Sequence, residues 1–523
     1  LRTHRWFATK SLEIRHARIV DAIPVPMEGH QAQVLLVEVD TGSGMPDTYV
    51  VPVLFGSGKR AQEIREWHAD AVLAEVELTG KGPPKQGIIY DALEEHVFAS
   101  SLLEGIGRRR TWKGQAGEFA AASAPGYRAL RGEDGRALTP HTLRAEQSNS
   151  SVAFGERLML KIFRRPVDGP NPELEVSGYL TRQGSFTNIA PVAGHIEYRR
   201  SRREPMTVGV LLGFVPNEGD AWRYTLDELK RYFERALMRS ADGESPPGTR
   251  RGLLGVLEQN PPELVGEMMG GYIEAARLLG RRTAEMHLAL AAPTDDPAFE
   301  PKPFTSLYQR SLYQSMRNLA TRTIHAVGDR MGTIPDAHRP VAERLVKERE
   351  RIVQAFRGLL DRKLPMSRIR IHGDYHLGQA LYTGKDFVIV DFEGEPARPV
   401  GERRLKRSAL HDVAGMLRSF DYAVHTLMVG PEGQGILRQE DLKMLEPWAA
   451  FWLRWVSSSY LRSYLHTAGD AAFIPAQRSD LELVLRVTTL EKAIYELGYE
   501  LNNRPEWIGI PLRGTMQLLR GSF

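Results

Sequence analysis

The chain has 523 residues, 42% hydrophobic and 26% charged, and at ~100–200 residues per domain this length predicts two to four compact domains. The 69 Lys and Arg against 65 Asp and Glu give a formal charge of +4, which indicates neither a nucleic-acid-binding protein nor a membrane-surface protein. The absence of cysteine excludes disulfides, thiolate metal sites and cysteine nucleophiles, and it is typical of a cytoplasmic protein. No run reaches the ~18–20 apolar residues of a transmembrane helix, and the N-terminus does not resemble a signal peptide.

The first 216 residues predict mainly strands. Short β-branched runs bounded by Gly, Pro and Asp turns lie at 18–23, 33–39 and 48–55 in the first hundred residues. A second β-rich region, at about 110–216, contains the runs 157–163, 195–198 and 207–215. One helix is predicted there over 172–183, with Pro172 in its first turn.

After Pro216 the sequence predicts helices. The i, i+3, i+4 apolar pattern covers 226–240, 262–291, 305–331, 342–362, 409–428, 440–468 and 481–502. One strand pair, 368–372 with 386–391, is predicted to interrupt them. A β-rich lobe followed by a helical lobe is an α+β arrangement, with predicted domains at 1–100, 101–216 and 217–523.

The pattern that predicts chemistry is His372-Gly-Asp-Tyr-His-Leu-Gly-Gln379, in which Asp374 and Gln379 are five residues apart and Asp391 follows twelve residues later. Phosphoryl transfer needs a carboxylate to accept the hydroxyl proton, and an amide and a second carboxylate to hold Mg²⁺. Kinase catalytic loops have this spacing, and Gln379 offers the same carbonyl oxygen as the more usual Asn. The alternative, that both Asp residues only form turns at strand ends, explains fewer of these groups.

Two histidines of this loop leave alternatives open. His372 is interpreted as orienting the loop backbone, and a purely structural histidine explains it equally well. His376 either lines the pocket or takes part in catalysis.

A phosphate clamp is predicted upstream. Lys161 lies in an apolar strand, and Glu175 follows on the predicted helix, with Glu173 as the second candidate. A strand Lys paired with a helix Glu is how kinases hold the α- and β-phosphates. The alternative is an edge-strand lysine whose head reaches solvent.

The rest of the predicted ATP site has weaker signals. The phosphate-covering loop is predicted at 146–151, through Ser148, Asn149 and Ser150, although it has no glycine nest. No G-x-x-x-x-G-K-[ST] motif occurs, which excludes a P-loop enzyme. Residues 209–216 are predicted to form the hinge, with the backbone near Val215 contacting the adenine edge. We expect ATP–Mg²⁺ to bind between the β-rich and helical lobes.

These residues resemble the maltokinase family. The matching segments are His372–Gln379, Asp391–Pro399, Glu402–Ser408, His411–Tyr422, Arg5–Phe7, Asn171–Glu175, Pro303–Tyr313 and Glu491–Arg504. The resemblance implies a bilobal protein-kinase-like (aminoglycoside-phosphotransferase-like) fold with an N-terminal cap, and ATP- and Mg²⁺-dependent conversion of maltose to maltose 1-phosphate for α-glucan synthesis from trehalose. It also implies Asp374 as base, Gln379 and Asp391 as metal ligands, and Lys161 with its Glu as phosphate clamp. His411 departs from the expected Arg, which puts no catalytic role in doubt.

The resemblance also bears on partners, because maltokinases occur alone or fused to trehalose synthase. The first residue is Leu1, which fits a trimmed chain or one half of such a fusion. The alternatives are a kinase for another small sugar or amino sugar, and a non-catalytic maltose- or nucleotide-binding module of a trehalose synthase fusion.

Candidate sugar-contacting residues come mostly from the C-terminal third. Tyr495, Tyr499 and Asn502 share one face of a predicted helix, which is either pocket or core. The stripe of Trp448, Trp452 and Trp455 fits a core better than a ligand site. The full candidate set is His376, Glu393, Arg398, Tyr422, Tyr495 and Tyr499.

Overall fold

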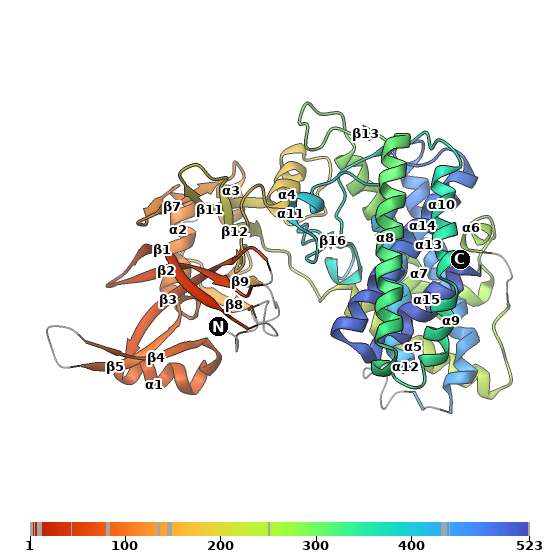
Figure 1. Cartoon of the computed structure of the whole chain (residues 1–523), viewed down its shortest axis with the longest axis horizontal. Coiled ribbons are helices and arrows are strands. Elements are labelled where there is room, and N and C mark those ends of the chain that lie inside the picture. The colour runs from red at the N-terminus through yellow and green to blue at the C-terminus, as the bar shows by residue number, and fades with distance from the viewer. Residues whose placement is uncertain are drawn as a thin grey trace. The chain divides into compact units, whose positions relative to one another are not determined.

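The computed structural model describes the chain except residues 1–3, 5, 8–12, 43, 80–83, 133–135, 144–148, 249–251, 430–436, 439 and 521–523. It divides into two compact units, Leu1–Pro216 and Asn217–Phe523. Figure 1 labels the helices and strands of both units.

The first unit contains two antiparallel sheets. The five-stranded sheet has the order β1-β2-β3-β5-β4, formed by β1 (His16–Met27), β2 (His30–Asp40), β3 (Asp47–Ser57), β5 (Lys85–Asp91) and β4 (Val72–Leu78). The seven-stranded sheet has the order β6-β7-β11-β12-β10-β9-β8, formed by β6 (Thr111–Lys113), β7 (Gly117–Ser123), β11 (Val192–Arg200), β12 (Met206–Gly213), β10 (Leu158–Phe163), β9 (Asn149–Phe154) and β8 (Pro140–Leu143). All strand runs predicted from β-branched composition are present in these sheets.

Four helices accompany the sheets: α1 (Gly58–Trp67), α2 (His96–Gly107), α3 (Tyr127–Arg131) and α4 (Pro172–Gln183). The bounds of α4 are those predicted, because its end signals are strong. The Asn171 side chain caps the first turn by accepting a hydrogen bond from the Leu174 amide at 3.2 Å. Gly184 ends the helix in the left-handed region, at φ +66°.

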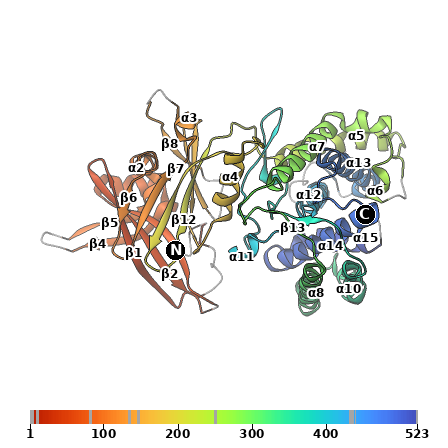
Figure 2. The same ribbon diagram turned by 90° about the horizontal axis from the view of Figure 1, so that it is seen from above.

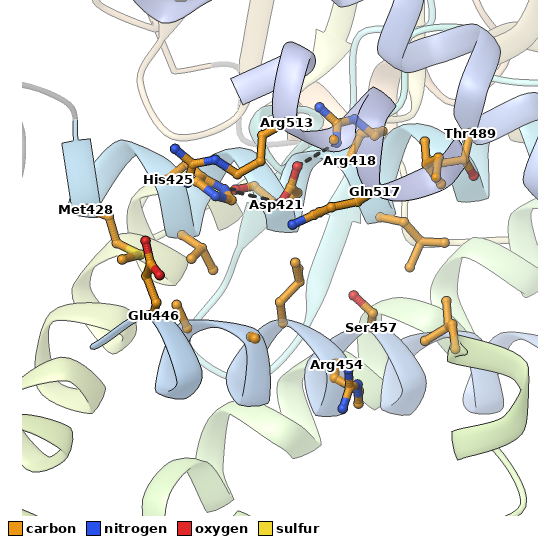
Figure 3. A pocket seen from close by; sticks show the side chains of 18 of the residues that line it. Arg418, Asp421, His425, Met428, Glu446, Arg454, Ser457, Thr489, Arg513 and Gln517 are labelled. Atoms are coloured by element: carbon orange, nitrogen blue, oxygen red, sulfur yellow. Dashed lines mark hydrogen bonds and ion pairs between the residues drawn. The ribbon is translucent and has the colours of Figure 1, made fainter. Parts of the chain in front are cut away.

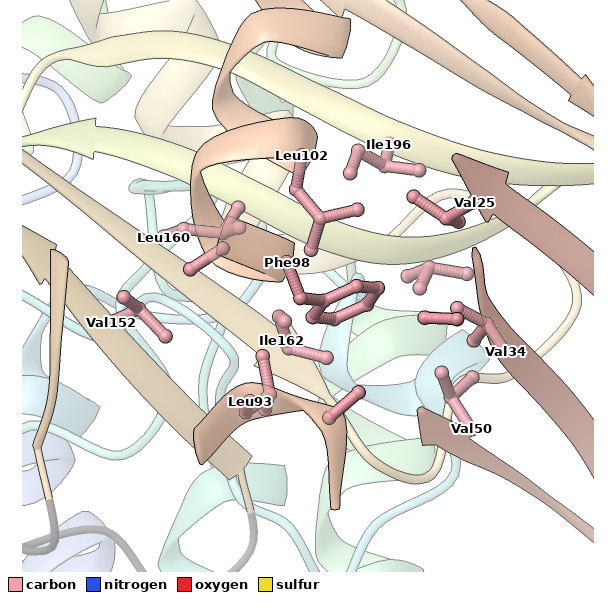
Figure 4. Packing of buried hydrophobic residues seen from close by; sticks show 14 of the residues in the cluster. Val25, Val34, Val50, Leu93, Phe98, Leu102, Val152, Leu160, Ile162 and Ile196 are labelled. Carbon is pink, nitrogen blue, oxygen red and sulfur yellow. The ribbon is translucent and has the colours of Figure 1, made fainter. Parts of the chain in front are cut away.

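Helix α2 joins the two sheets into one core. It contacts β1 of the first sheet and β7, β8 and β11 of the second. Phe98 and Leu102 of α2 belong to one buried cluster with Val25 and Val34 of the five-stranded sheet and Leu160 and Ile196 of the seven-stranded sheet (Figure 4). The five-stranded and seven-stranded sheets therefore bury their apolar faces against the same helix.

Buried polar contacts fix how the two sheets meet. Arg164, 2% exposed, directs Nη2 to Asp91 Oδ2 at 2.5 Å and Nε to Ser150 Oγ at 2.8 Å. The same guanidinium lies 5.0 Å from the ring of Trp6. Tyr198 of β11 donates to Asp21 of β1 at 2.9 Å. A buried arginine thus holds the five-stranded sheet, the N-terminal segment and β9 together.

The second unit is mostly helical. Its helices are α5 (Ala221–Ala241), α6 (Leu253–Val256), α7 (Glu263–Leu290), α8 (Ser306–Asp329), α9 (Arg339–Lys347), α10 (Arg349–Arg357), α11 (Val400–Arg403), α12 (Leu410–Val429), α13 (Leu442–Ala468), α14 (Arg478–Asn503) and α15 (Gly509–Leu519). Helix α12 packs against α5, α13, α14 and α15 (Figure 2). Trp448, Trp452 and Trp455 are buried, which confirms the core interpretation of that stripe. No described helix is long and apolar enough to cross a membrane.

Two sequence predictions in this unit are wrong. The helix predicted over 342–362 is two helices, because Glu348 leaves the helical region at φ −88° and ψ 7°, and a periodic apolar pattern does not reveal a one-residue break. The strand pair 368–372 with 386–391 does not form. Instead β13 (Lys302–Pro303) pairs with β14 (Ser367–Arg368), and β15 (Ala380–Tyr382) pairs with β16 (Phe387–Ile389).

Replacing Asp91 with Ala leaves the Arg164 guanidinium buried without its carboxylate. We expect a loss of about 3–5 kcal/mol in the free energy of unfolding of the first unit, the usual cost of breaking a buried pair. This loss is measured from the hydrogen exchange of the β3 and β10 amides at increasing urea concentration. The double variant Arg164→Met/Asp91→Leu should lose less than Asp91→Ala alone; an equal or greater loss would show that the pair is not what holds the sheets.

Candidate active site

The short β15–β16 hairpin brings two of the predicted metal ligands together. Its register pairs Ala380 with Ile389, so Gln379 lies opposite Val390 and close to Asp391, the next residue. Gln379 Nε2 donates to Asp391 Oδ2 at 3.0 Å, and the Val390 amide donates to the Gln379 carbonyl at 3.0 Å. The hairpin therefore explains why an amide and a carboxylate twelve residues apart meet.

Asp412, at the start of α12, holds the loop that carries Asp374. It is 1% exposed, and its carboxylate accepts hydrogen bonds from the amides of His372 at 2.8 Å and Gly373 at 2.9 Å. His287 Nε2 lies 3.0 Å from the same carboxylate. The predicted strand therefore finds other partners, because Asp412 takes the amide of its last residue, His372, and Ile369 pairs with Arg407.

One face of α12 follows the loop for two turns. A Cβ on Gly415 would lie 2.4 Å from the Tyr375 carbonyl oxygen, so only glycine lets helix and loop backbones approach this closely. One turn further, Ser419 Oγ accepts a hydrogen bond from the Leu377 amide at 3.1 Å. Asp412, Gly415 and Ser419 thus present a matched surface to the loop.

His372 connects this loop to Asp391. Its Nε2 donates to the Val390 carbonyl at 2.9 Å, which leaves Nδ1 as the acceptor facing the Asp374 amide at 3.4 Å. The imidazole therefore acts as a positioning group. Asp391 follows Val390 with φ +67°, a left-handed conformation that costs of order 1–3 kcal/mol for a non-glycine residue.

Lys492 of α14 is the main group that the sequence predictions missed. Its Nζ lies 3.3 Å from Asp374 Oδ1 and 3.5 Å from Glu395 Oε2, and 5.1 Å from the Tyr495 ring. Its side chain is 14% exposed. The available signal in the sequence was a lysine within a largely apolar helical stretch. A signal of the same kind, a lysine within an apolar strand, identified Lys161.

The charges of this cluster favour an ionised Asp374. Burial works to raise the pKa of Asp374, but the positive charge of Lys492 holds it below its usual value. Burial lowers the pKa of His376, which keeps that imidazole neutral. Burial and the Asp374 charge raise the pKa of Glu395. The cluster therefore contains one carboxylate suited to accept a proton near neutral pH and a second that holds its proton more tightly.

The other candidate sugar residues lie in different surroundings. Tyr495 is beside Lys492, and Arg398 Nη2 lies 3.9 Å from Glu491. Tyr422 donates to Glu500 at 3.2 Å, and Tyr499, 45% exposed, lies 5.6 Å from Arg504. Glu393 is half-buried, two residues after Asp391. The structure thus brings Tyr495, but not Tyr422, into contact with the Asp374 cluster.

The predicted ATP residues lie in the first unit. Lys161 is 5% exposed in β10, and Glu173 is 2% exposed in α4, whereas Glu175 is half-buried. Lys161 pairs in register with Ser151 and Val210. Asn149 and Ser150 begin β9, and Ser150 accepts from Arg164. Val215 follows β12, and Ser148 lies outside the described residues.

A divalent metal would have oxygen ligands available at the hairpin. With Nε2 donating to Asp391, Gln379 keeps its carbonyl oxygen as a donor atom, and Asp391 supplies a carboxylate. Over the described residues, no group of three or more His, Asp or Glu side chains could hold a metal ion by itself. This set fits Mg²⁺, which commonly binds one or two carboxylates together with substrate phosphates.

Comparison with known sequences finds a family model for the N-terminal part and kinase relatives along most of the chain. Residues 1–94 match the family model of the maltokinase N-terminal cap domain. A glucosamine kinase from Streptacidiphilus jiangxiensis is 24% identical over 469 residues, covering 89% of both chains. A glucosamine kinase from Mycolicibacterium smegmatis is 23% identical over 373 residues, covering 70% of this chain and 76% of the relative. The first 94 residues are therefore similar to a maltokinase cap, and most of the chain is similar to glucosamine kinases.

Solved structures give the same fold. A glucosamine kinase in complex with glucosamine, ADP and inorganic phosphate superposes with a TM-score of 0.60 at 20% identity, covering 98% of this chain and 96% of that one. A second crystal form gives 0.62, covering 99% and 97%. The predicted kinase-like α+β fold with a β-rich cap is therefore confirmed.

Lys492→Met should move the acid limb of the pH–rate profile to higher pH. A base works only when ionised, so with Asp374 as the predicted base turnover should fall as the pH drops through the pKa of Asp374. Removing the cation that lowers this pKa makes the loss begin at a higher pH. The profile of kcat against pH measures the shift. Lys385→Met removes an exposed lysine and should leave the profile in place; an unmoved limb in Lys492→Met would contradict the assignment.

Proposed function

We propose that this chain is an ATP-dependent maltokinase that transfers the γ-phosphoryl group to the anomeric hydroxyl of maltose, giving maltose 1-phosphate and ADP. The observation that carries the proposal is the Asp374–Gln379–Asp391 arrangement in a chain with a maltokinase-type cap. Supply of maltose by a trehalose synthase, fused or separate, is part of the proposal.

In this proposal Asp374 accepts the proton of the attacking hydroxyl. The hydroxyl oxygen forms the bond to phosphorus as the bond to the ADP oxygen breaks, and the proton moves to the carboxylate. Lys492, 3.3 Å away, keeps Asp374 ionised before the reaction and fixes its orientation. Asp412 holds the loop that carries Asp374, so the base is already oriented before the substrate binds.

Gln379 and Asp391 would hold Mg²⁺, which supplies positive charge to the β- and γ-phosphates. The strained backbone of Asp391, at φ +67°, directs this carboxylate from the end of the hairpin. In the first unit, Lys161 would bind the α- and β-phosphates and would be oriented by Glu175 or Glu173. Asn149, Ser150 and the Val215 backbone complete the proposed nucleotide contacts.

The acceptor would lie at the Asp374 cluster, against Lys492, Glu395 and Tyr495. His376 and Arg398 are retained as candidate contacts, as are Glu393, Tyr422 and Tyr499. A second candidate acceptor is glucosamine, because the relatives matched over most of this chain are glucosamine kinases. Glu395 would favour an amino sugar, since a buried carboxylate with a raised pKa gains from a nearby ammonium group.

Two variants test the roles of the carboxylates. Asp374→Asn keeps the shape but removes the proton acceptor, so we expect kcat to fall by roughly 10²–10⁴ with little change in ATP affinity. Asp391→Asn should also abolish turnover, and it should raise the Mg²⁺ concentration needed for nucleotide binding. Titration calorimetry with ATP at varied Mg²⁺ concentration distinguishes the role of Asp374 from that of Asp391. Lost ATP binding in Asp374→Asn with unchanged kcat would reverse the two assignments.

The acceptor is decided by kcat/KM for maltose, glucose, glucosamine and trehalose, measured with ATP and Mg²⁺. We expect maltose to give the highest value. A higher value for glucosamine would favour the second candidate. The absence of phosphate transfer to every sugar, with ATP still bound, would support a non-catalytic binding module instead.

A further inference from the structure

A hollow of about 550 Å³ lies in the helical unit among α6, α12, α13, α14 and α15. Its apolar lining includes Leu253, Val424 and Leu453. Ser457 of α13 and Thr489 of α14 add hydroxyl groups to the wall. This volume is within the ~300–1,000 Å³ of small-molecule sites, and an apolar wall with a few polar groups is typical of them.

The α15 side of the hollow is cationic. Arg513, Gln517 and Arg520 recur at i, i+4 and i+7, which places them along one side of that helix. Figure 3 shows Arg513 and Gln517 across the hollow from Ser457 and Glu446 of α13. Neither Arg513 nor Arg520 forms an ion pair with any residue the structure describes.

The remaining charges do not cancel this cationic side. Arg418 at the wall is already engaged by Asp421 at 2.5 Å and Glu496 at 2.7 Å, and His425 contacts Asp421 at 3.2 Å. Four arginines line the hollow, and the carboxylates beside them are Asp421 and Glu446 of the wall and Glu496, which binds Arg418. A ligand with negative charge is therefore favoured over a neutral or cationic one.

The hollow is separate from the catalytic loop because α12 presents different residues to each. Asp412, Gly415 and Ser419 contact the loop, whereas Arg418 and Asp421 line the hollow, together with His425. The sets are interleaved along the helix, so the loop and the hollow lie against different sides of α12. None of Asp374, Gln379 and Asp391 lines the hollow.

We propose that this hollow is a second ligand site that binds a phosphorylated sugar. The phosphate lies against Arg513 and Arg520, which are suited to phosphate oxygens by their planar donor groups. The sugar hydroxyls bind Gln517, Ser457 and Thr489, and the ring packs on the apolar wall. Inorganic phosphate alone leaves most of the volume and these hydroxyl contacts unused.

Titration calorimetry of the full chain with glucose 6-phosphate as probe tests the proposal. Arg513→Gln/Arg520→Gln should weaken binding at least ten-fold, since both charge-assisted contacts to the phosphate are lost. Arg310→Gln/Arg344→Gln removes two exposed arginines of α8 and α9 and should leave binding unchanged. Ala450→Trp, which fills the mouth of the hollow from α13, should abolish binding without removing charge. Circular dichroism and melting temperature verify that each variant is folded.

Further probes separate the outcomes. Saturating ATP–Mg²⁺ should not displace glucose 6-phosphate, and glucose alone should bind much more weakly. Displacement by ATP, or unchanged binding in both the arginine and the Ala450→Trp variants, would place the ligand elsewhere and overturn the proposal. Failure of glucose 6-phosphate to bind the parent chain, or equal affinity for inorganic phosphate, would overturn it as well. None of these readouts depends on which sugar the catalytic site phosphorylates.

Discussion

The carboxylate of Asp412 is the contact on which the candidate active site depends. It is buried, and burial alone would favour the neutral acid, but the hydrogen bond from His287 and the neighbouring histidines lower its pKa below the usual value. The resulting anion is satisfied by two backbone amides of the loop, at His372 and Gly373. A buried anion destabilises the fold unless its hydrogen-bond partners are present. The hydrogen bonds that stabilise this charge therefore also fix the loop that carries Asp374.

Helix α12 extends this constraint along the loop. Gly415 permits contact between helix and loop backbones, and Ser419 binds the Leu377 amide. On the other side of the loop, His372 binds the carbonyl that precedes Asp391. Asp374 and the proposed metal ligands are therefore positioned by hydrogen bonds that start from one helix, although the hairpin itself has only three residue pairs. Lys492 adds the cation that lowers the pKa of Asp374.

A corresponding arrangement organises the first unit. Arg164 follows the strand that carries Lys161, and it binds Asp91 of the five-stranded sheet together with Ser150 of β9. A change at the cap thus reaches the predicted phosphate-contacting strand through one buried guanidinium. The Asp21–Tyr198 hydrogen bond and the packing around Phe98 make the same connection elsewhere. The cap and the seven-stranded sheet share one core, which explains why the chain folds them as one unit.

The sequence by itself determined those features that depend only on residues close together along the chain. Helix periodicity, the Asn171 and Gly184 end signals of α4, the kinase-like fold class and the proximity of Gln379 to Asp391 all follow from local patterns, and the structure contains them; the roles of the individual residues stay predictions. Only the tertiary structure decided which strands pair, since 368–372 has no local signal that Asp412, forty residues after His372, will bind the amide of His372 or that Ile369 will pair with Arg407. It also decided that Lys492 meets Asp374 across 118 residues. Pairing energies between distant segments depend on packing that no single segment encodes, because each contact exists only after the helices have come together.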